Sequence, residues 1–255
     1  MGLDPAVVVA LVAASFGAAF VNGVIGFGFA LLAVNALAAV LGAKDGIIVL
    51  SLLTPLVSGL HVWRYRVHSA TVSRLSTLVL AAVLGTVLGA RILVLLPGSV
   101  ISLALGLFTA FDALIELRGR RAPLATGTER RLAPVAGFVG GISNGTLGAA
   151  GPVLGTYLIA IGLRGGQFAF AISVVFFAMS IVRTAVLAGL GQYTSAIGLL
   201  GLILLVPSVV GQRVGFWLRG RLPAPTVERA VLGLLLLASL NLLYRGVEGL
   251  VAAAD

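Results

Sequence analysis

Two short asparagine–glycine motifs combine hydrogen-bond donors with a backbone that can turn sharply. The segment 20–26 (FVNGVIG) recurs in the second half of the chain as segment 142–148 (ISNGTLG). Asparagine amides donate hydrogen bonds, and glycines let the backbone approach a bound molecule closely. A helix that begins after such a turn presents unpaired N–H groups and a partial positive charge. This chemistry suits a small anion, because it supplies donors without burying many full charges.

The two turns define one set of candidate substrate-binding residues. A helix starting near Phe27, and another starting after the turn at 144–152, would aim their N-termini inward from opposite sides. A second interpretation is that the glycines only let helices pack closely, as small residues do in membranes. That interpretation is favoured for any single glycine, whereas the pairing of the motifs favours a binding site. The candidates are Asn22, Gly23, Gly26, Phe27, Gly28, Asn144, Gly145, Thr146, Gly148, Gly151 and Pro152.

Arg91, Arg183 and Gln212 are further candidates for binding the anion, because a polar group inside an apolar span is costly. Both arginines lie toward the outer side of their spans, where either could attract an anion at the external mouth. Extension of the side chain to the lipid–water interface is the favoured alternative for each arginine. Asp112 and His61 are candidates for carrying a coupling proton, and interfacial placement is the favoured alternative for Asp112.

The composition places these residues in a membrane protein. Of the 255 residues, 60% are hydrophobic and 10% are charged, and the mean hydropathy is +1.16. A soluble domain is nearer half apolar and a quarter charged. Uncharged runs at 5–43, 92–111, 132–163 and 184–212 reach the length of about 20 residues that a membrane-spanning helix needs. The surface must therefore be covered largely by lipid.

Cysteine and charge exclude several other classes of protein. The chain has no cysteine and two histidines, so we expect no disulfide, no metal site and no cofactor. Its net charge of +9 fits basic loops on the cytoplasmic side of a membrane. Scattered arginines without interleaved aromatic residues do not form a nucleic-acid surface, so we expect no nucleic-acid partner.

The two motifs belong to a repeat that covers both halves of the chain. Glycine and Leu-Pro positions within 84–97 recur in register within 210–223. The sequence predicts a first membrane repeat at 1–118, a basic linker at 119–131 and a second repeat at 132–255. The predicted helical segments are 5–43, 46–64, 72–96, 99–118, 132–163, 165–188, 194–218 and 225–245.

The first segment of each half is too long for a single crossing. A straight helix over 5–43 would be about 58 Å long, against a hydrocarbon core of about 30 Å. The glycine-rich turn therefore predicts a helical hairpin, either two short spans or a re-entrant pair. With hairpins, most of the 17 basic residues fall on the side of the linker, as the positive-inside rule requires.

A hairpin plus three single spans is an odd number of crossings, so the second half must be inverted relative to the first. The predicted fold is an all-α polytopic membrane protein. It has two inverted-topology repeats, each a glycine-broken helical hairpin plus three transmembrane helices, with both termini on the outer face.

The paired glycine-rich turns, the basic central linker and the length resemble the TauE/SafE sulfite-exporter family of membrane permeases. The strongest part of the resemblance is Asn144-Gly145 through Gly151-Pro152, which is similar to the second glycine-rich turn of that family. The resemblance implies export of small sulfur-containing anions such as sulfite, thiosulfate or organosulfonates. It also implies a multi-pass protein of the bacterial plasma membrane, with the linker in the cytoplasm.

Other functions stay open at the level of sequence. The same fold could transport another small anion or solute, with protons as a candidate coupling ion. A non-transporting membrane scaffold subunit is the alternative from a different class, although it would not need two facing glycine-rich turns. The sequence contains no Walker motif, no His-Glu-x-x-His and no recognisable grouping for covalent catalysis, so we expect no enzyme.

Overall fold

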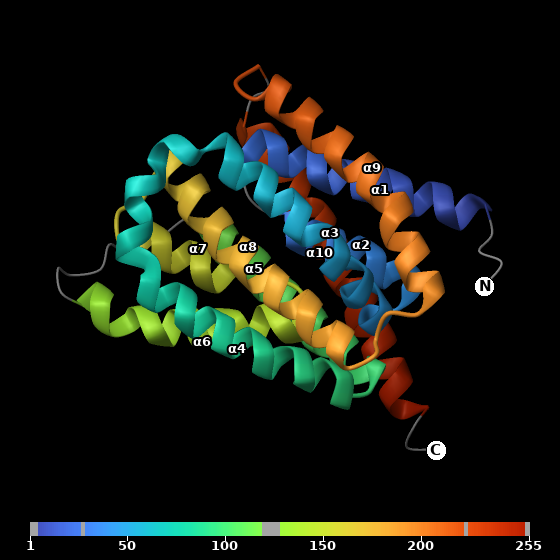
Figure 1. Ribbon diagram of the computed structural model, residues 1–255. Coiled ribbons are helices and arrows are strands. Elements are labelled where there is room, and N and C mark those ends of the chain that lie inside the picture. The colour runs from blue at the N-terminus through green and yellow to red at the C-terminus, as the bar shows by residue number, and fades with distance from the viewer. Residues whose placement is uncertain (1–4, 27–28, 119–127, 222–223, 253–255) are drawn as a thin grey trace.

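The computed structural model describes residues 5–26, 29–118, 128–221 and 224–252, and this described part is helical without a strand. Its order is the same in both halves: a long helix, a short helix and three further long helices (Figure 1). The elements are α1 (Pro5–Ile25), α2 (Phe29–Leu41), α3 (Ala43–Arg64), the 3-10 helix η1 (Arg66–Leu75), α4 (Ser76–Leu95), α5 (Gly98–Arg118), α6 (Thr128–Leu147), α7 (Gly151–Ala160), α8 (Gly165–Gly189), α9 (Ser195–Leu218) and α10 (Ala224–Val251).

Seven helices of the described chain are long and apolar enough to cross a membrane, which confirms the predicted multi-pass fold. They are α1, α3, α4, α5, α8, α9 and α10. The short helices α2 and α7 have 13 and 10 residues. At 1.5 Å per residue they are about 20 and 15 Å long, so neither crosses a core of about 30 Å alone. Each hairpin therefore pairs one long helix with one short helix.

Glycines break both hairpins where the sequence predicts it. Gly26 follows α1 with a φ of 100°, and Gly148 follows α6 with a φ of 74°. Both angles lie in the left-handed region, where a Cβ atom is strained and glycine is favoured. The remaining helix boundaries agree closely with the predicted segments except before α4. There the polar stretch Arg66–Leu75 forms η1, and the apolar α4 begins at Ser76 rather than at residue 72.

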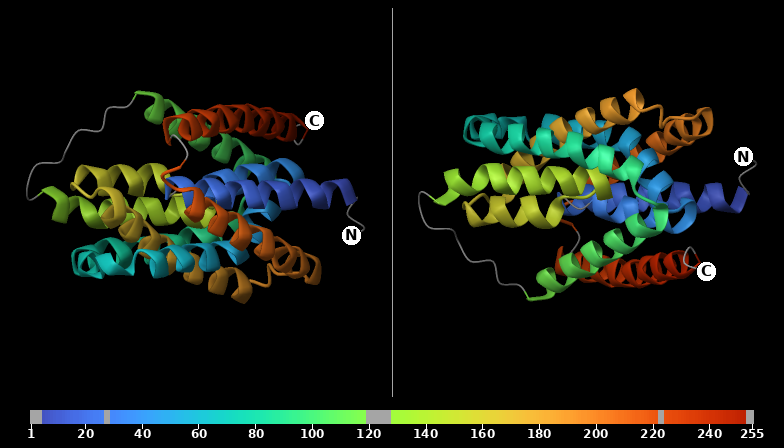
Figure 2. Two further views of the ribbon diagram at one scale, coloured as in Figure 1. Left: turned by 90° about the horizontal axis from the view of Figure 1, so that it is seen from above. Right: turned by 90° about the horizontal axis from the view of Figure 1, so that it is seen from below.

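The helices of one half pack mainly against helices of the other. The most extensive pairings join α4 with α6, α1 with α9 and α5 with α10. The N- and C-terminal ends lie on one side of the molecule, whereas the end of α5 and the start of α6 lie on the opposite side (Figure 2). The predicted linker 119–131 falls mostly outside the described residues, and its last four residues form the first turn of α6.

The α4–α6 crossing brings two backbones into contact. A Cβ atom added to Gly145 would lie 2.5 Å from the carbonyl oxygen of Thr86, and one added to Gly85 would collide with the carbonyl oxygen of Phe138. Gly89 faces the Cα of Gly145 in the same crossing. Glycine is therefore required here by the close approach of the helices, and the packing interpretation applies to Gly145.

The α1–α9 crossing repeats this arrangement. A Cβ atom on Gly23 would lie 2.5 Å from the carbonyl oxygen of Gln212, and one on Gly211 would collide with the carbonyl oxygen of Phe16. Gly215 faces the Cα of Gly23, as Gly89 faces Gly145. The first helix of each half thus packs, glycine against glycine, on the third long helix of the other half.

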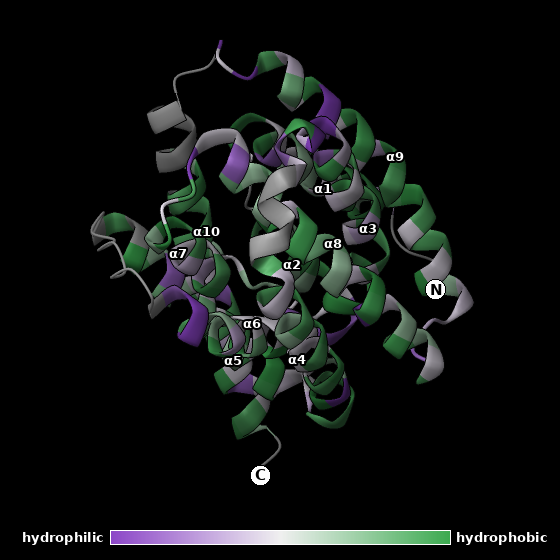
Figure 3. Ribbon diagram, turned by 60° about the vertical axis from the view of Figure 1, so that its left-hand side comes forward, coloured by the Kyte–Doolittle hydropathy of each residue, from purple (hydrophilic) through white to green (hydrophobic). Residues whose placement is uncertain are grey.

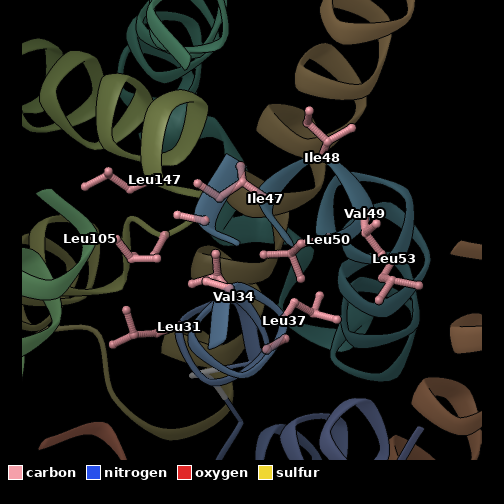
Figure 4. Packing of buried hydrophobic residues seen from close by; sticks show 14 of the residues in the cluster. Leu31, Val34, Leu37, Ile47, Ile48, Val49, Leu50, Leu53, Leu105 and Leu147 are labelled. Atoms are coloured by element: carbon pink, nitrogen blue, oxygen red, sulfur yellow. The ribbon is translucent and has the colours of Figure 1, made fainter. Parts of the chain in front are cut away.

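Apolar residues form both the interior and much of the exterior. The main core cluster joins the two halves around α2 and α3, with Val34, Leu50, Leu105 and Leu147 converging in its centre (Figure 4). On the outside, apolar residues cover long stretches of the helices and hydrophilic residues gather toward the helix ends (Figure 3). Leu237 of α10, for example, is 68% exposed. This distribution fits a chain surrounded by lipid.

We expect Gly145→Ala to destabilise the protein, because the added methyl group forces α4 and α6 apart. Overpacking of this kind costs about 1–3 kcal/mol. Thermal unfolding of the purified protein in detergent measures the effect. Gly233→Ala is the matched control, since a Cβ atom there meets nothing within 4 Å. Equal unfolding temperatures for the two variants would contradict the role assigned to the crossing.

Candidate functional site

A cavity of about 50 Å³ lies between the two hairpins and the helices α3 and α8. This is enough space for several water-sized groups. Both halves of the chain contribute to its wall. The lining residues are Asn22, Gly26, Phe29, Ala30, Leu31, Thr54, Val57, Ser58, His61, Gly151, Ile172, Ser173 and Phe176.

Two helix N-termini contribute to this wall. Phe29 is the first residue of α2 and Gly151 is the first residue of α7. The backbone N–H of Phe29 donates to Oδ1 of Asn22 at 3.4 Å. A Cβ atom on Gly151 would meet nothing within 4 Å, so space adjoins the start of α7. The partial positive charges of both helix ends therefore add to the potential in the cavity.

His61 is held at the cavity by amide groups from two other helices. The ring is only 1% exposed. Its Nδ1 lies 3.4 Å from Nδ2 of Asn22 and also contacts Nε2 of Gln212. Gln212 Nε2 donates in addition to the carbonyl oxygen of Val57 at 3.0 Å. His61 Nε2 is buried and has no hydrogen-bond partner. One ring nitrogen is therefore fixed by the protein and the other is available to a ligand.

Arg183 lies directly behind the cavity wall. Its side chain is fully buried, with Nη1 donating to the carbonyl oxygen of Asn144 at 2.9 Å and Nη2 donating to Oγ1 of Thr54 at 3.2 Å. Arg183 Nε and both polar atoms of the Asn144 side chain are buried without partners. No carboxylate of the described chain forms an ion pair with this guanidinium.

The structure corrects the favoured interpretation of Arg183 as an interfacial residue. An arginine that reaches the lipid–water interface keeps its guanidinium in water, whereas the Arg183 side chain is 0% exposed. A position near the outer end of its span does not make Arg183 interfacial, because its side chain turns inward toward Asn144 and Thr54. A buried cation without an acidic partner favours binding of an anion.

The two polar clusters occupy related positions in the two halves. Asn22 and His61 are 39 residues apart, and so are Asn144 and Arg183. In both pairs the asparagine lies near the end of the first helix of the hairpin, and its partner lies on the long helix after the hairpin. The position on the long helix after the hairpin thus carries the imidazole of His61 in the first half and the permanently charged Arg183 in the second.

The glycines at both breaks lie beside guanidinium groups. A Cβ atom on Gly148 would lie 3.3 Å from Nη1 of Arg183, and one on Gly26 would lie 3.3 Å from Nη1 of Arg219. Arg219 also lies over the ring of Tyr65, 5.3 Å from its centroid. Burial lowers the pKa of Arg219, and the nearby Arg64 lowers it further. The end of the cavity at Gly26 is therefore bordered by partly desolvated positive charge.

Of the predicted site residues that the structure describes, only Asn22, Gly26, His61 and Gly151 line the cavity. Arg91 is exposed on α4, and Asp112 lies half-buried on α5. Thr146 donates to the carbonyl oxygen of Gly89 at 3.1 Å, so its hydroxyl joins α6 to α4. Pro152 is buried in the first turn of α7. Two more predicted residues, Phe27 and Gly28, fall outside the described residues.

Sequence reasoning missed three lining hydroxyl residues, Thr54, Ser58 and Ser173. A signal was present, because Thr54, Ser58 and His61 follow the spacing of one face of a helix in an otherwise apolar span. Ser173 carries no comparable signal, since Ser and Thr are common in membrane helices and bond to their own backbone. Its hydroxyl donates to the carbonyl oxygen of Ala169.

The comparison with protein families decides the identity of this fold. The sulfite exporter TauE/SafE family matches residues 11–242. The chain belongs to the TauE/SafE family. Membership makes it a membrane transporter of sulfur-containing anions, and the match includes the second hairpin, the first hairpin from residue 11 onward and every residue of the cavity wall. No curated protein and no solved structure matches the chain.

We expect Arg183→Met to abolish stabilisation of the protein by sulfite. A ligand present at 100 times its Kd stabilises the native state by about 2.7 kcal/mol, and this gain needs the buried cation. Without sulfite the variant should unfold at the same temperature as the wild type or higher, because burial of an unpaired charge is costly. Thermal unfolding in detergent, with and without sulfite, measures both effects.

The exposed Arg91 supplies the control for this experiment. Arg91→Met removes the same charge from the lipid-facing side of α4 and should leave the stabilisation by sulfite unchanged. If sulfite stabilises the Arg183→Met variant as much as the wild type, Arg183 does not belong to the anion site.

Proposed function

We propose that the chain is a secondary transporter that exports a small sulfur-containing anion, held between the two broken hairpins, by alternating access. One observation carries this proposal: Arg183, a fully buried cation with no carboxylate partner in the described chain, donates a hydrogen bond to Thr54, a residue of the cavity wall. Lipid and apolar side chains cannot compensate that charge, whereas a bound anion does. The proposed setting is the bacterial plasma membrane, with the central linker in the cytoplasm.

Sulfite is the smallest of the three anions, with one sulfur and three oxygen atoms, and is therefore the first substrate to test. Thiosulfate is larger by one sulfur atom, and an organosulfonate adds an organic group, for which the apolar wall residues Phe29, Ile172 and Phe176 are the available contacts.

The pairing of helices between the halves supports an inverted repeat. α1 packs on α9 as α6 packs on α4, and α1 and α6 start from opposite sides of the molecule (Figure 2). Two halves related in this way can exchange conformations, so that the cavity opens first to one side and then to the other. In this mechanism each hairpin would move together with the helix that its glycines contact.

Liposomes containing the purified protein should take up or release labelled sulfite faster than protein-free liposomes. Arg183→Met should lower this rate at least about tenfold, because the loss of one charged hydrogen-bond donor costs about 1.5–3 kcal/mol. Arg91→Met is the control for general damage. Sulfite flux no faster than in protein-free liposomes, under both directions of gradient, would overturn the proposed function.

Single-cysteine labelling tests the inverted repeat, and the chain offers a cysteine-free background. Val67 follows α3 in the first half and is exposed, and Gln192 follows α8 in the second half and is half-buried. Val67→Cys should react with a membrane-impermeant maleimide only from the cytoplasmic side, and Gln192→Cys only from the outside. Labelling of both positions from one side would exclude the inverted arrangement.

A further inference from the structure

We infer that His61 binds the transported anion as a neutral Nε2–H donor and does not carry a proton across the membrane. This inference rests on the proposed function and assigns a role within the same site. It follows from the hydrogen bonds that surround the ring, from the charges that face it and from the related position of Arg183.

The side chains around Nδ1 of His61 favour it as a hydrogen-bond acceptor. Both side-chain groups that contact it are amide nitrogens, Nδ2 of Asn22 and Nε2 of Gln212, while the backbone carbonyl oxygens of Val57 and Asn22 also lie near the ring. An amide NH2 group donates and does not accept, so Nδ1 must present its lone pair. The hydrogen bond at one ring nitrogen determines which nitrogen carries the proton. The neutral ring therefore carries its proton on Nε2.

Neighbouring groups fix the orientation of both amides. Gln212 Nε2 also donates to the carbonyl oxygen of Val57, which is an acceptor only. Asn22 Oδ1 accepts from the backbone N–H of Phe29, which is a donor only. Rotating either amide by 180° would place oxygen against oxygen at Val57 or N–H against N–H at Phe29. The two amides therefore cannot turn to accept a proton from Nδ1.

The charges that face His61 disfavour a second proton on the ring. Arg219 acts on it from the end of α9, and Arg64 follows it by one turn on α3. Its other titratable neighbour is Tyr65, whose ring centroid is 5.9 Å away, and the ring of Phe216 packs edge-on at 4.8 Å. A charged imidazole would thus meet like charge and apolar rings in a buried position.

The remaining nitrogen suits an anion oxygen. His61 lines the cavity, and its Nε2 is buried without a partner in the described chain. In the other half, Arg183 supplies the permanent charge from the related position. One fixed cation and one neutral donor would then contact the same anion from opposite halves. Gln212, predicted to line the site, becomes a positioning residue that acts through His61.

Nitrogen-15 NMR of labelled histidine tests this assignment without relying on transport. The chain has only two histidines, so His68→Gln leaves a single signal pair from His61. Between pH 5 and 8 we expect Nδ1 without a proton and Nε2 with one. Gln212→Glu is the positive control, because a carboxylate accepts from Nδ1 and should produce a ring protonated at both nitrogens. Protonation of Nδ1 in the His68→Gln protein would overturn the inference.

Flux measurements with an entrapped pH indicator give an independent readout. His61→Gln places an amide NH2 near the position of Nε2 and cannot titrate, so it should retain more sulfite flux than His61→Met, with a pH profile of the same shape as that of the wild type. His61→Met removes the donor and should lower sulfite flux at least about tenfold.

Either of two results would contradict the neutral role of His61 while leaving the proposed function intact. One is that His61→Gln loses sulfite flux although the parent protein transports sulfite at its normal rate. The other is loss in His61→Gln of a proton movement that accompanies sulfite in the parent protein. Absence of sulfite flux in the parent protein would instead contradict the proposed function, and the NMR experiment would still decide the protonation state.

Discussion

The architecture depends on two helix crossings at which backbone meets backbone. Gly23 against Gly215, and Gly145 against Gly89, let the first helix of each half approach a helix of the other half more closely than any side chain would permit. Only this proximity places both breaks, at Gly26 and Gly148, in the interior of the protein. In a bilayer, burial of apolar surface between helices contributes little to the free energy of helix association, because lipid is equally apolar. Close packing of this kind is therefore a principal source of helix–helix association.

The crossings also explain how polar groups come to be buried in an apolar protein. Gln212 lies in the α1–α9 crossing and reaches His61, while Thr146 joins α6 to α4 through the carbonyl oxygen of Gly89. Each crossing thus supplies partners for polar side chains that lipid could not satisfy. The buried polar atoms left without partners in the described chain include atoms of His61, which lines the cavity, and of Arg183, which donates to the wall residue Thr54.

The two halves share a framework but have diverged in charge. Where one half carries His61 beside Asn22, the other carries Arg183 beside Asn144 at the same spacing. A repeat that kept arginine in both positions would bury two permanent cations close together, which is costly without two anionic charges. Exchanging one arginine for histidine keeps a donor in place while removing a charge. Divergence between repeats therefore adjusts the charge of the site to its substrate.

The sequence by itself determined the membrane class and the two glycine breaks, because hydropathy and the positions of glycines are local properties. It also placed Asn22, Asn144, Arg183 and His61 among the candidates. It could not decide which glycines pack and which adjoin the cavity, nor that Arg183 is buried rather than interfacial. Those outcomes depend on which helix of the other half lies opposite each residue, and only the tertiary structure decides that.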